Sequence, residues 1–226
     1  MILMKEKLYK HAPLVLLLAG LLLWFAALSI DRFYHKQVLV WMPFVIIQLI
    51  VSTACGILIR TLYQQVHMDA LTGLRNRKYF FAKLSEIKTK TPVSLILIDI
   101  DNFKGINDTY GHMVGDHVLH QFGEILQNST RKNDIIARWG GEEFAVILFH
   151  TDTEEAFNIA DRIRTVVEDH VFSCETITCK ITISIGIASI EEGKDVGTEQ
   201  FIRVADEALY RAKEKKNYIV IDADCR

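Results

Sequence analysis

The sequence of 226 residues lacks the patterns that mark several classes of protein. Its four cysteines contain no C-x-x-C pair, which argues against a zinc site or a disulfide framework and favours free cytosolic thiols. With a net charge of −2 it has no basic excess to neutralise phosphates, so nucleic acid is not an expected partner. It also has no acidic tail, no repeat, no low-complexity tract and only three prolines. Its length suits one domain with something extra.

Apolar residues make up half of the chain, and their excess lies in the first 60 residues. Residues 13–30 are apolar apart from Ser29, and residues 38–59 are interrupted only by Gln48, Ser52 and Thr53. Each run is close to the ~20 residues that a helix needs to cross a bilayer. The sequence therefore predicts a transmembrane anchor over residues 1–60, a two-helix hairpin (about 13–30 and 38–59) in contact with membrane lipid.

Basic residues outside the two runs predict how the anchor is oriented. Three lysines precede the first run and four basic residues follow the second, against Arg32 and Lys36 between them. Because cytoplasmic segments carry the excess of Lys and Arg, both ends of the hairpin and the domain that follows are expected in the cytoplasm. The first run also has the basic start and the Ala26-Ala27 pair of a signal peptide, although its apolar stretch is too long for one. Either interpretation leaves the following domain inside the cell.

Residues 61–68 are predicted to continue the second run as a helical linker, and residues 69–226 to form a domain. Apolar periodicity and Gly/Pro breaks predict its elements. They are helix 77–88, strand 93–98, helix 113–129, a hairpin at 140–141, helix 153–170, strand-like residues 176–189, helix 198–215 and strand 218–221. Helices that alternate with strands around one hairpin predict an α/β sandwich with a single mixed sheet.

Residues 138–144, Arg-Trp-Gly-Gly-Glu-Glu-Phe, are the most informative stretch. Apolar strand-like runs flank them, so Gly140 and Gly141 are predicted to form the tight turn of a hairpin. Two carboxylates, Glu142 and Glu143, follow directly. Acids at the tip of a buried hairpin need a partner, and a divalent metal is a common one. An ordinary hairpin with a charged tip is the alternative.

Asp99 lies at the carboxyl end of the first predicted strand of the domain, where open α/β sheets gather ligands. If that strand lies beside the hairpin, Asp99 and Glu142 converge. A few carboxylate oxygens together with substrate phosphates are what Mg²⁺ takes, so this pair suggests a site that handles nucleotides. An acid that caps the next turn is the alternative for Asp99.

Four motifs together resemble the GGDEF domain of diguanylate cyclases. They are Asp69-x-Leu-Thr-Gly-Leu-x-Asn-Arg77, Asp99-Ile-Asp-x-Phe-Lys104-x-x-Asn107-Asp, Tyr110-Gly-His112-x-x-Gly-Asp116 and Arg138-Trp-Gly-Gly-Glu-Glu-Phe144. The resemblance covers residues 67–226 and implies a palm-like, ferredoxin-related fold. It also implies an enzyme of the bacterial inner membrane, active as a homodimer. Each domain of the dimer would bind one GTP, and the two GTP would condense into cyclic di-GMP with release of two pyrophosphates.

The resemblance also implies the roles at the metal site. Asp99, the backbone carbonyl of Ile100 and Glu142 would bind Mg²⁺ or Mn²⁺, and Glu143 would share in metal binding. Glu142 would accept the proton of the attacking 3′-hydroxyl, and Lys104 would stabilise charge on the phosphates. Phosphoryl transfer asks the protein mainly for positioning and charge neutralisation, which metals and a lysine supply. Glu142 replaces the aspartate of the name motif, a change that the family accepts.

Other matched positions are implied to bind GTP. Asn107 and Asp116 would recognise guanine, because a carboxylate accepts from the ring N–H and exocyclic amine that adenine lacks in that arrangement. Phosphates would lie over a turn from Phe103 to Gly105, and Lys213 would reach them as well. His112 would touch the nucleotide, with a solvent-exposed histidine at a helix start as the alternative.

Arg131 and Asp134 match the R-x-x-D product site of the family, where cyclic di-GMP would bind and inhibit; a solvated loop is the alternative. The signature of the last helix is intact to Lys213, but the glycine and basic residue expected next are replaced by Glu-Lys-Lys-Asn at 214–217. Which of Lys215 and Lys216 takes the second basic role stays open. Three rival functions are a silent receptor for cyclic di-GMP, another palm-type nucleotidyl transferase and a membrane interaction protein.

Overall fold

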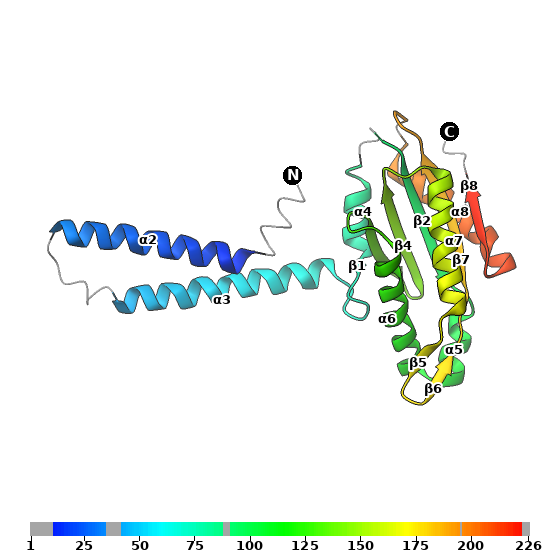
Figure 1. Ribbon diagram of the computed structural model, residues 1–226, viewed down its shortest axis with the longest axis horizontal. Coiled ribbons are helices and arrows are strands. Elements are labelled where there is room, and N and C mark those ends of the chain that lie inside the picture. Colours follow the sequence, from blue (N-terminus) through cyan, green and yellow to red (C-terminus); the bar gives the residue numbers. More distant parts are fainter. Residues whose placement is uncertain (1–10, 35–41, 88–90, 195, 223–226) are drawn as a thin grey trace. The chain divides into compact units, whose positions relative to one another are not determined.

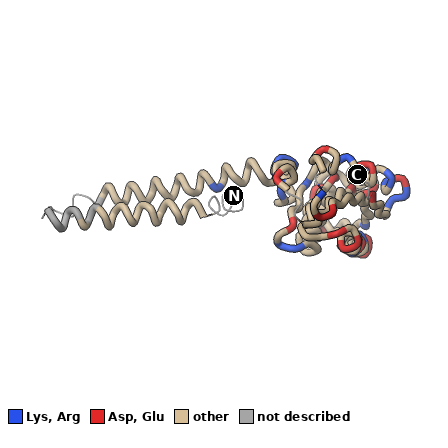
Figure 2. Tube along the Cα trace, turned by 90° about the horizontal axis from the view of Figure 1, so that it is seen from above, with Lys and Arg blue, Asp and Glu red and all other residues tan. Residues whose placement is uncertain are grey.

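The protein is described by a computed structural model that covers residues 11–34, 42–87, 91–194 and 196–222. The chain divides into two compact units, Met1–Val66 and His67–Arg226. Charged residues concentrate in the second unit, whereas the described helices of the first carry almost none (Figure 2). The two units therefore suit different surroundings, and each is considered by itself.

The first unit contains two antiparallel helices, α2 (Ala12–Tyr34) and α3 (Met42–His67), the second of which ends at the start of the other unit (Figure 1). The helices touch closely at Gly56, where an added Cβ would lie 2.4 Å from the Pro13 Cα. Among the described residues, one helix, Pro43–His67, is long and apolar enough to cross a membrane, and a shorter apolar helix covers Ala12–Ala26. The two-span hairpin therefore stays a prediction, and residues 38–41 of its second run lie outside the described residues.

A six-stranded sheet in the order β1-β3-β4-β2-β7-β8 forms the centre of the second unit. Its central strand β2 (Val93–Ile100) is antiparallel to both neighbours, β4 (Glu143–Phe149) and β7 (Ile183–Ile190). On one side β3 (Ile135–Gly140) pairs antiparallel with β4 and parallel with β1 (Arg75–Asn76); on the other, β8 (Ile219–Asp222) pairs parallel with β7. The predicted mixed sheet is confirmed.

Helices cover both faces of this sheet (Figure 1). Helices α4 (Arg77–Leu84) and α8 (Thr198–Lys215) share one apolar cluster with Leu95 and Leu97 of β2. The other cluster joins Ile96 and Ile98 to α5 (Phe103–Tyr110), α6 (His112–Ser129) and α7 (Thr153–Asp169). Successive strand residues point to opposite faces, so the completely buried β2 serves both clusters and is apolar from Leu95 to Ile98. A palm-like α/β fold is thus confirmed.

Two local predictions are wrong, and a third, the strand-like range, divides into two strands. The strand-like residues 176–189 form two strands, β6 (Ile177–Cys179) and β7, and β6 pairs with an unpredicted β5 (Phe172–Cys174). Helix α4 ends at Leu84, where the N–H of Ser85 donates to the carbonyl of Phe81. The expected turn at residues 103–105 is the first turn of α5, a helix of only eight residues, which is too short for its apolar spacing to predict a helix.

Candidate active site

The hairpin between β3 and β4 turns one residue later than predicted. Gly140 still pairs with Glu143, a register shift lies between Arg138 and Gly140, and the turn consists of Gly141 and Glu142. The bulge therefore uses one residue before the turn, which shifts it forward. Gly141 has φ +38°, a conformation that glycine adopts without steric cost, and Glu142 lies at the tip.

The hairpin tip meets the end of β2, as the predicted convergence requires. Asp99 is the register partner of Glu143, and the N–H of Ile100 donates to the carbonyl of Glu142 over 3.4 Å. Cross-strand partners lie on the same face of a sheet. Asp99, Glu142 and Glu143 are thus brought to one end of the sheet by two neighbouring strands.

Asp99 is almost completely buried, with 5% of its surface exposed, and its Oδ2 accepts a hydrogen bond from Lys213 Nζ at 2.7 Å. Burial raises the pKa of Asp99; the hydrogen bond and charge of Lys213 oppose this shift, while the charges of Glu142 and Asp101 add to it. One lysine therefore only partly compensates the negative charge at the end of β2.

The neighbouring groups respond to the same charges. Burial raises the pKa of Glu143, and the negative charge of Asp99 raises it further. For Lys213, desolvation acts to lower the pKa, but the hydrogen bond and charge of Asp99 outweigh it and the pKa rises. Carboxyl groups held close together repel one another when they are ionised. A nearby cation offsets this repulsion and stabilises their ionised forms.

The residues at this end of the sheet fit a divalent cation. The described residues contain no group of three or more His, Cys, Asp or Glu side chains arranged to hold a metal by themselves. Mg²⁺, however, is commonly held by one or two carboxylates and completes its shell with water and substrate phosphates. The oxygens of Asp99 and Glu142, with excess negative charge around them, are a donor set of that kind.

Helices α5 and α6 bring the predicted guanine-binding residues together. Asn107 is half-buried on α5 and packs against Gly115 of α6, where an added Cβ would lie 2.0 Å from Asn107 Oδ1. A Cβ at position 115 would displace the Asn107 side chain, and the exposed Asp116 follows this glycine directly. Asn107 and Asp116, 9 residues apart in the sequence, therefore lie on two helices that touch at Gly115.

The remaining predicted nucleotide contacts lie around the same helices. Lys104 is exposed on the first turn of α5, and His112 is exposed as the first residue of α6. Phe103 is buried in the core with 7% exposure. The N–H of Gly105 donates to the carbonyl of Asn102 at 2.9 Å, so the predicted phosphate contact at residues 103–105 cannot use that N–H without losing this bond.

The R-x-x-D residues form a compact turn between α6 and β3. Asp134 Oδ2 accepts from the backbone N–H of Arg131 at 2.9 Å, and the guanidinium of Arg131 pairs with Glu155 of α7. Burial raises the pKa of Asp134 and the charge of Glu155 adds to this, against two backbone hydrogen bonds and the charge of Arg131. Arg131 and Asp134 are thus side by side, but Arg131 already has an acidic partner.

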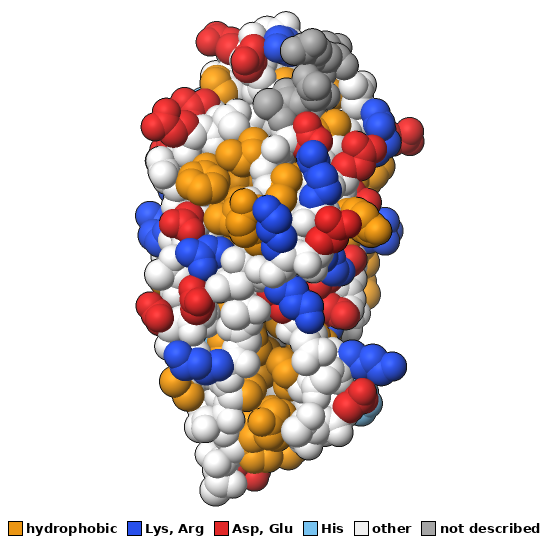
Figure 3. Space-filling model, turned by 90° about the vertical axis from the view of Figure 1, so that its right-hand side faces the viewer, with side chains coloured by type: hydrophobic (Ala, Val, Ile, Leu, Met, Phe, Trp, Pro, Cys, Tyr) orange, Lys and Arg blue, Asp and Glu red, His pale blue; other side chains and the backbone are white. Residues whose placement is uncertain are grey.

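Beyond Lys213, Lys215 Nζ lies 4.3 Å from the centre of the Tyr218 ring, a cation–π contact. Lys216 follows at the end of α8 with φ +56°. Around α8 and β8, acidic and basic side chains are interspersed with exposed hydrophobic ones (Figure 3). These contacts do not show which of the two lysines takes the second basic role. The surface around α8 and β8 carries charges of both signs and no patch of one sign.

Two further polar residues were missed by the sequence analysis. Arg138 donates to the carbonyl of Gly141 through Nε at 2.8 Å and pairs with Asp69 over 3.3 Å, which ties the hairpin turn to the start of the domain. Asp101 is buried and accepts three hydrogen bonds beside Asp99. Both residues lie within the motifs quoted above, so their motif positions could have marked them as important. The sequence does not show which residues they contact.

Comparison with known proteins places this geometry in a family. The family model described as diguanylate cyclase, GGDEF domain, matches residues 66–218. The chain is 44% identical over 161 residues to a probable diguanylate cyclase, DgcT, of Escherichia coli K12, a match that covers 69% of this chain and 35% of that protein. For the first curated relatives the covered share of their own length is 35–43%.

Solved structures give the same result. The coiled coil and GGDEF domain of DgcB from Caulobacter crescentus, in complex with c-di-GMP, superimposes with a TM-score of 0.68 at 29% identity, covering 77% of this chain and 97% of that one. The active GGEEF domain of a diguanylate cyclase from Vibrio cholerae gives a TM-score of 0.59 at 35% identity, covering 65% and 96%. The family match over residues 66–218 includes Asp99 and the hairpin.

Proposed function

Because the chain belongs to the GGDEF-domain diguanylate cyclase family, we propose that it condenses two GTP into cyclic di-GMP. The observation that carries the proposal is the meeting of Asp99, Glu142 and Glu143 at one end of the sheet, with Lys213 as their cation. In each half-reaction the 3′-oxygen of one GTP forms a bond to the α-phosphorus of the other, whose bond to pyrophosphate breaks. Two such steps release two pyrophosphates.

Each site residue has a role in this proposal. Glu142 accepts the proton of the 3′-hydroxyl, and Lys104 and Lys213 neutralise phosphate charge. Asp99, Glu142 and the carbonyl of Ile100 would hold Mg²⁺ or Mn²⁺, with Glu143 sharing in it, and the bound ion would supply charge neutralisation and a lowered hydroxyl pKa. An active GGEEF domain from Vibrio cholerae supports a glutamate at position 142.

Guanine would be bound between α5 and α6. Asn107 and Asp116 offer an amide and a carboxylate to its Watson–Crick edge, and the exposed His112 stands at the entry of α6. A site built around a carboxylate acceptor rejects a base that lacks the matching N–H donors. Separate incubations with GTP and ATP test this recognition, and equal turnover of the two would favour another type of nucleotidyl transferase.

The domain arrangement completes the proposal. Residues 69–226 would be the catalytic domain, residues 61–68 a helical linker, and residues 1–60 an inner-membrane anchor of two spans that leaves the domain in the cytoplasm. One apolar helix of spanning length supports the anchor. Two copies of the chain would each present one GTP, because the two phosphoryl acceptors must face one another.

The turn at Arg131 and Asp134 would bind the product and inhibit the enzyme. Its support is one turn that carries both the exposed guanidinium of Arg131 and the carboxylate of Asp134, which accepts from the Arg131 backbone N–H. A guanidinium and a carboxylate together match the edge of a guanine or a phosphate. If that turn binds cyclic di-GMP while a verified dimer turns over no GTP, the chain is a receptor. Incubation of the purified chain with GTP and Mg²⁺, followed by chromatography of the nucleotides, distinguishes the two.

A further inference from the structure

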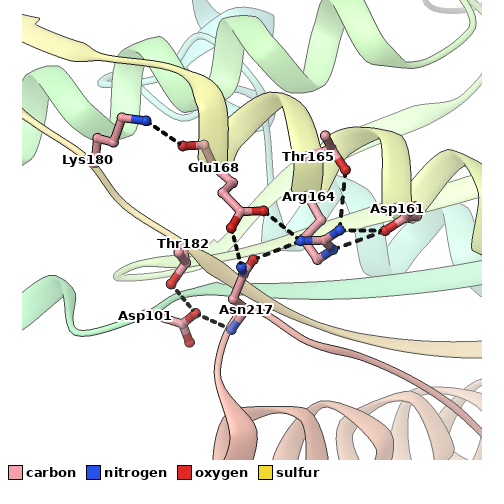
Figure 4. A network of polar contacts seen from close by, with 8 residues as sticks. All are labelled: Asp101, Asp161, Arg164, Thr165, Glu168, Lys180, Thr182 and Asn217. Carbon is pink, nitrogen blue, oxygen red and sulfur yellow. Dashed lines mark hydrogen bonds and ion pairs between the residues drawn. The ribbon is translucent and has the colours of Figure 1, made fainter.

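Asp101 joins three segments at the end of β2. Its Oδ1 accepts from Ser184 Oγ at 2.7 Å, and its Oδ2 accepts from Thr182 Oγ1 at 2.7 Å and from the backbone N–H of Asn217 at 2.8 Å. The residue is 8% exposed. Figure 4 draws its bonds to Thr182 and Asn217. Ser184 lies near the start of β7 and Thr182 directly precedes this strand, whereas Asn217 belongs to the connection between α8 and β8.

The side chain of Asn217 is held by α7, whereas its backbone N–H bonds to Asp101. Its Nδ2 donates to Glu168 Oε1 at 2.9 Å, and its Oδ1 accepts from Arg164 Nη1 at 3.2 Å. Arg164 also pairs with Glu168 and with Asp161 on α7, so the network continues along that helix (Figure 4). Asn217 is therefore fixed between β2 and α7 by both its backbone and its amide.

The backbone at this connection needs such support. Lys216 has φ +56° with ψ 156°, and Asn217 has φ +46°. A lysine in the first of these regions, which glycine otherwise occupies, is strained and persists only where the surrounding structure holds it there. The sequence has no glycine at these two positions. The hydrogen bonds of Asp101 and Asn217 therefore hold the backbone in this conformation.

The same short segment carries Lys213. Its Nζ bonds to Asp99, while Asn217, four residues later, bonds to Asp101, so both ends of residues 213–217 are attached to the end of β2. The attachment at Asp101 involves backbone and cannot relax by a side-chain rotation of the lysine. The position of the final turn of α8, and with it of the Lys213 ammonium, follows from the bond at Asp101.

We propose that Asp101 is a positioning residue that acts through Lys213. By holding Asn217 it keeps the end of α8 where Lys213 meets Asp99 and the phosphates; the inference rests on the proposed function for the phosphates. Asp101 has accepted three hydrogen bonds with its two oxygens, which leaves little acceptor capacity for a metal. Its role therefore differs from that of Asp99, although the two residues are only two positions apart.

The test is a double-mutant cycle of Asp101→Asn and Lys213→Ala, read as kcat/KM for GTP. In Asp101→Asn the NH₂ group can donate to Ser184 Oγ while the amide oxygen still accepts from Thr182 and from the N–H of Asn217. The acceptor loses its negative charge, however, so the bond to the N–H of Asn217 becomes weaker. We expect a loss of about tenfold from Asp101→Asn alone, in line with a hydrogen bond to a charged group. In the Lys213→Ala background the same change should cost less than about twofold, because residues that act as a unit are not additive.

Thermal unfolding separates positioning from structure. Asp101→Asn should lower the Tm equally in both backgrounds, since its bonds to Thr182 and Ser184 do not involve Lys213. A matched control, Asp161→Asn at the far end of the network, should leave kcat/KM within about twofold of wild type because it keeps the bond of Asn217 to Asp101. If the losses from Asp101→Asn and Lys213→Ala multiply in kcat/KM, the inference is wrong.

A second outcome would also overturn it. If Asp101→Asn raises the Mg²⁺ concentration needed for half-maximal rate and leaves KM for GTP unchanged, Asp101 is a metal ligand. The same cycle read as the Kd of a non-hydrolysable GTP analogue keeps the test independent of turnover. An inactive wild type that still shows coupling between Asp101 and Lys213 in analogue binding would refute the proposed function but not this positioning role.

Discussion

The end of β2 and the turn at residues 131–134 both place a basic side chain beside a carboxylate, but they differ in burial. The Asp99 side chain is 7% exposed where it meets Lys213, whereas the Glu155 side chain is 40% exposed where it meets Arg131. Electrostatic interactions weaken with solvent screening, so the pair with the buried carboxylate is more strongly coupled than the exposed pair. The end of β2 therefore holds its charges in fixed positions, whereas Arg131 in the exposed turn can exchange Glu155 for another partner.

This difference has a counterpart in the proposed roles. A site for phosphoryl transfer needs charges fixed before the substrate arrives, because preorganised charge costs no rearrangement during reaction. A regulatory site needs a partner that the product can displace. Substitutions at the end of β2 should therefore change turnover. Substitutions at the turn of residues 131–134 should change inhibition by the product.

The largest expected effect is at the hairpin tip. Glu142→Gln keeps the size of the side chain but removes the proton acceptor and a metal-binding charge, and should reduce kcat on the order of a thousandfold. Initial rates of cyclic di-GMP formation measure this, with Glu192→Gln in an exposed segment as the matched control. A reduction shared equally by the two variants would contradict a special role for Glu142.

The second effect concerns inhibition alone. Arg131→Ala removes the exposed guanidinium and should raise the concentration of cyclic di-GMP that halves the rate by about tenfold or more, as for loss of a charged hydrogen bond. The initial rate without product should stay near wild type, because Arg131 does not touch the residues at the end of β2. Progress curves with added product measure both, and unchanged inhibition would remove the turn from the proposal.

A smaller effect in the opposite direction is expected at Glu155. Glu155→Gln releases the guanidinium of Arg131 for the product, so inhibition should need about two- to fivefold less cyclic di-GMP, since exposed ion pairs are worth up to about 1 kcal/mol. Glu154→Gln, one residue earlier on α7, is the control. Weaker inhibition in Glu155→Gln would mean that Glu155 instead orients Arg131 for binding.

The smallest effect is a change in the pH dependence of stability. Because burial and Asp99 raise the pKa of Glu143, the folded state binds this proton more readily than the unfolded state. Stability is then lost as the pH rises from the ordinary pKa of glutamate, about 4.3, through the raised value. Metal-free Glu143→Gln should escape that loss, by less than about 1 kcal/mol because the group is partly exposed to solvent.

Thermal unfolding with a chelator, at a series of pH values from below the ordinary glutamate pKa to neutral, measures the difference between wild type and Glu143→Gln. Adding Mg²⁺ at neutral pH should raise the Tm of the wild type more than that of the variant. A wild type that becomes more stable than Glu143→Gln as the pH rises would contradict the raised pKa.

Much of the fold could be predicted because its signals are local. The β2 run is apolar on both faces of the sheet, so composition alone indicated a buried strand that ends on Asp99. Helix α5 was missed because Phe103 and Ile106 are its only buried residues, and its stability depends on packing against α6. The hairpin was predicted, but the bulge that moves its turn to Gly141 and Glu142 depends on pairing with β4.

The site divides in the same way. Asp99 and Glu142 could be found from a strand end and a glycine pair, and their convergence needed only neighbouring strands. The partners of Asp101 could not be found, because Thr182 and Asn217 are 81 and 116 residues away along the chain. Glu155 likewise meets Arg131 across 24 residues, and no local pattern records that contact.

The most direct test is GTP turnover by the purified full chain in detergent with Mg²⁺, beside Glu142→Gln, with chromatography of the nucleotide product. Cyclic di-GMP from the wild type and none above background from Glu142→Gln are the expected results. A verified dimer that binds cyclic di-GMP but converts no GTP would contradict the proposed enzyme and leave a receptor in its place.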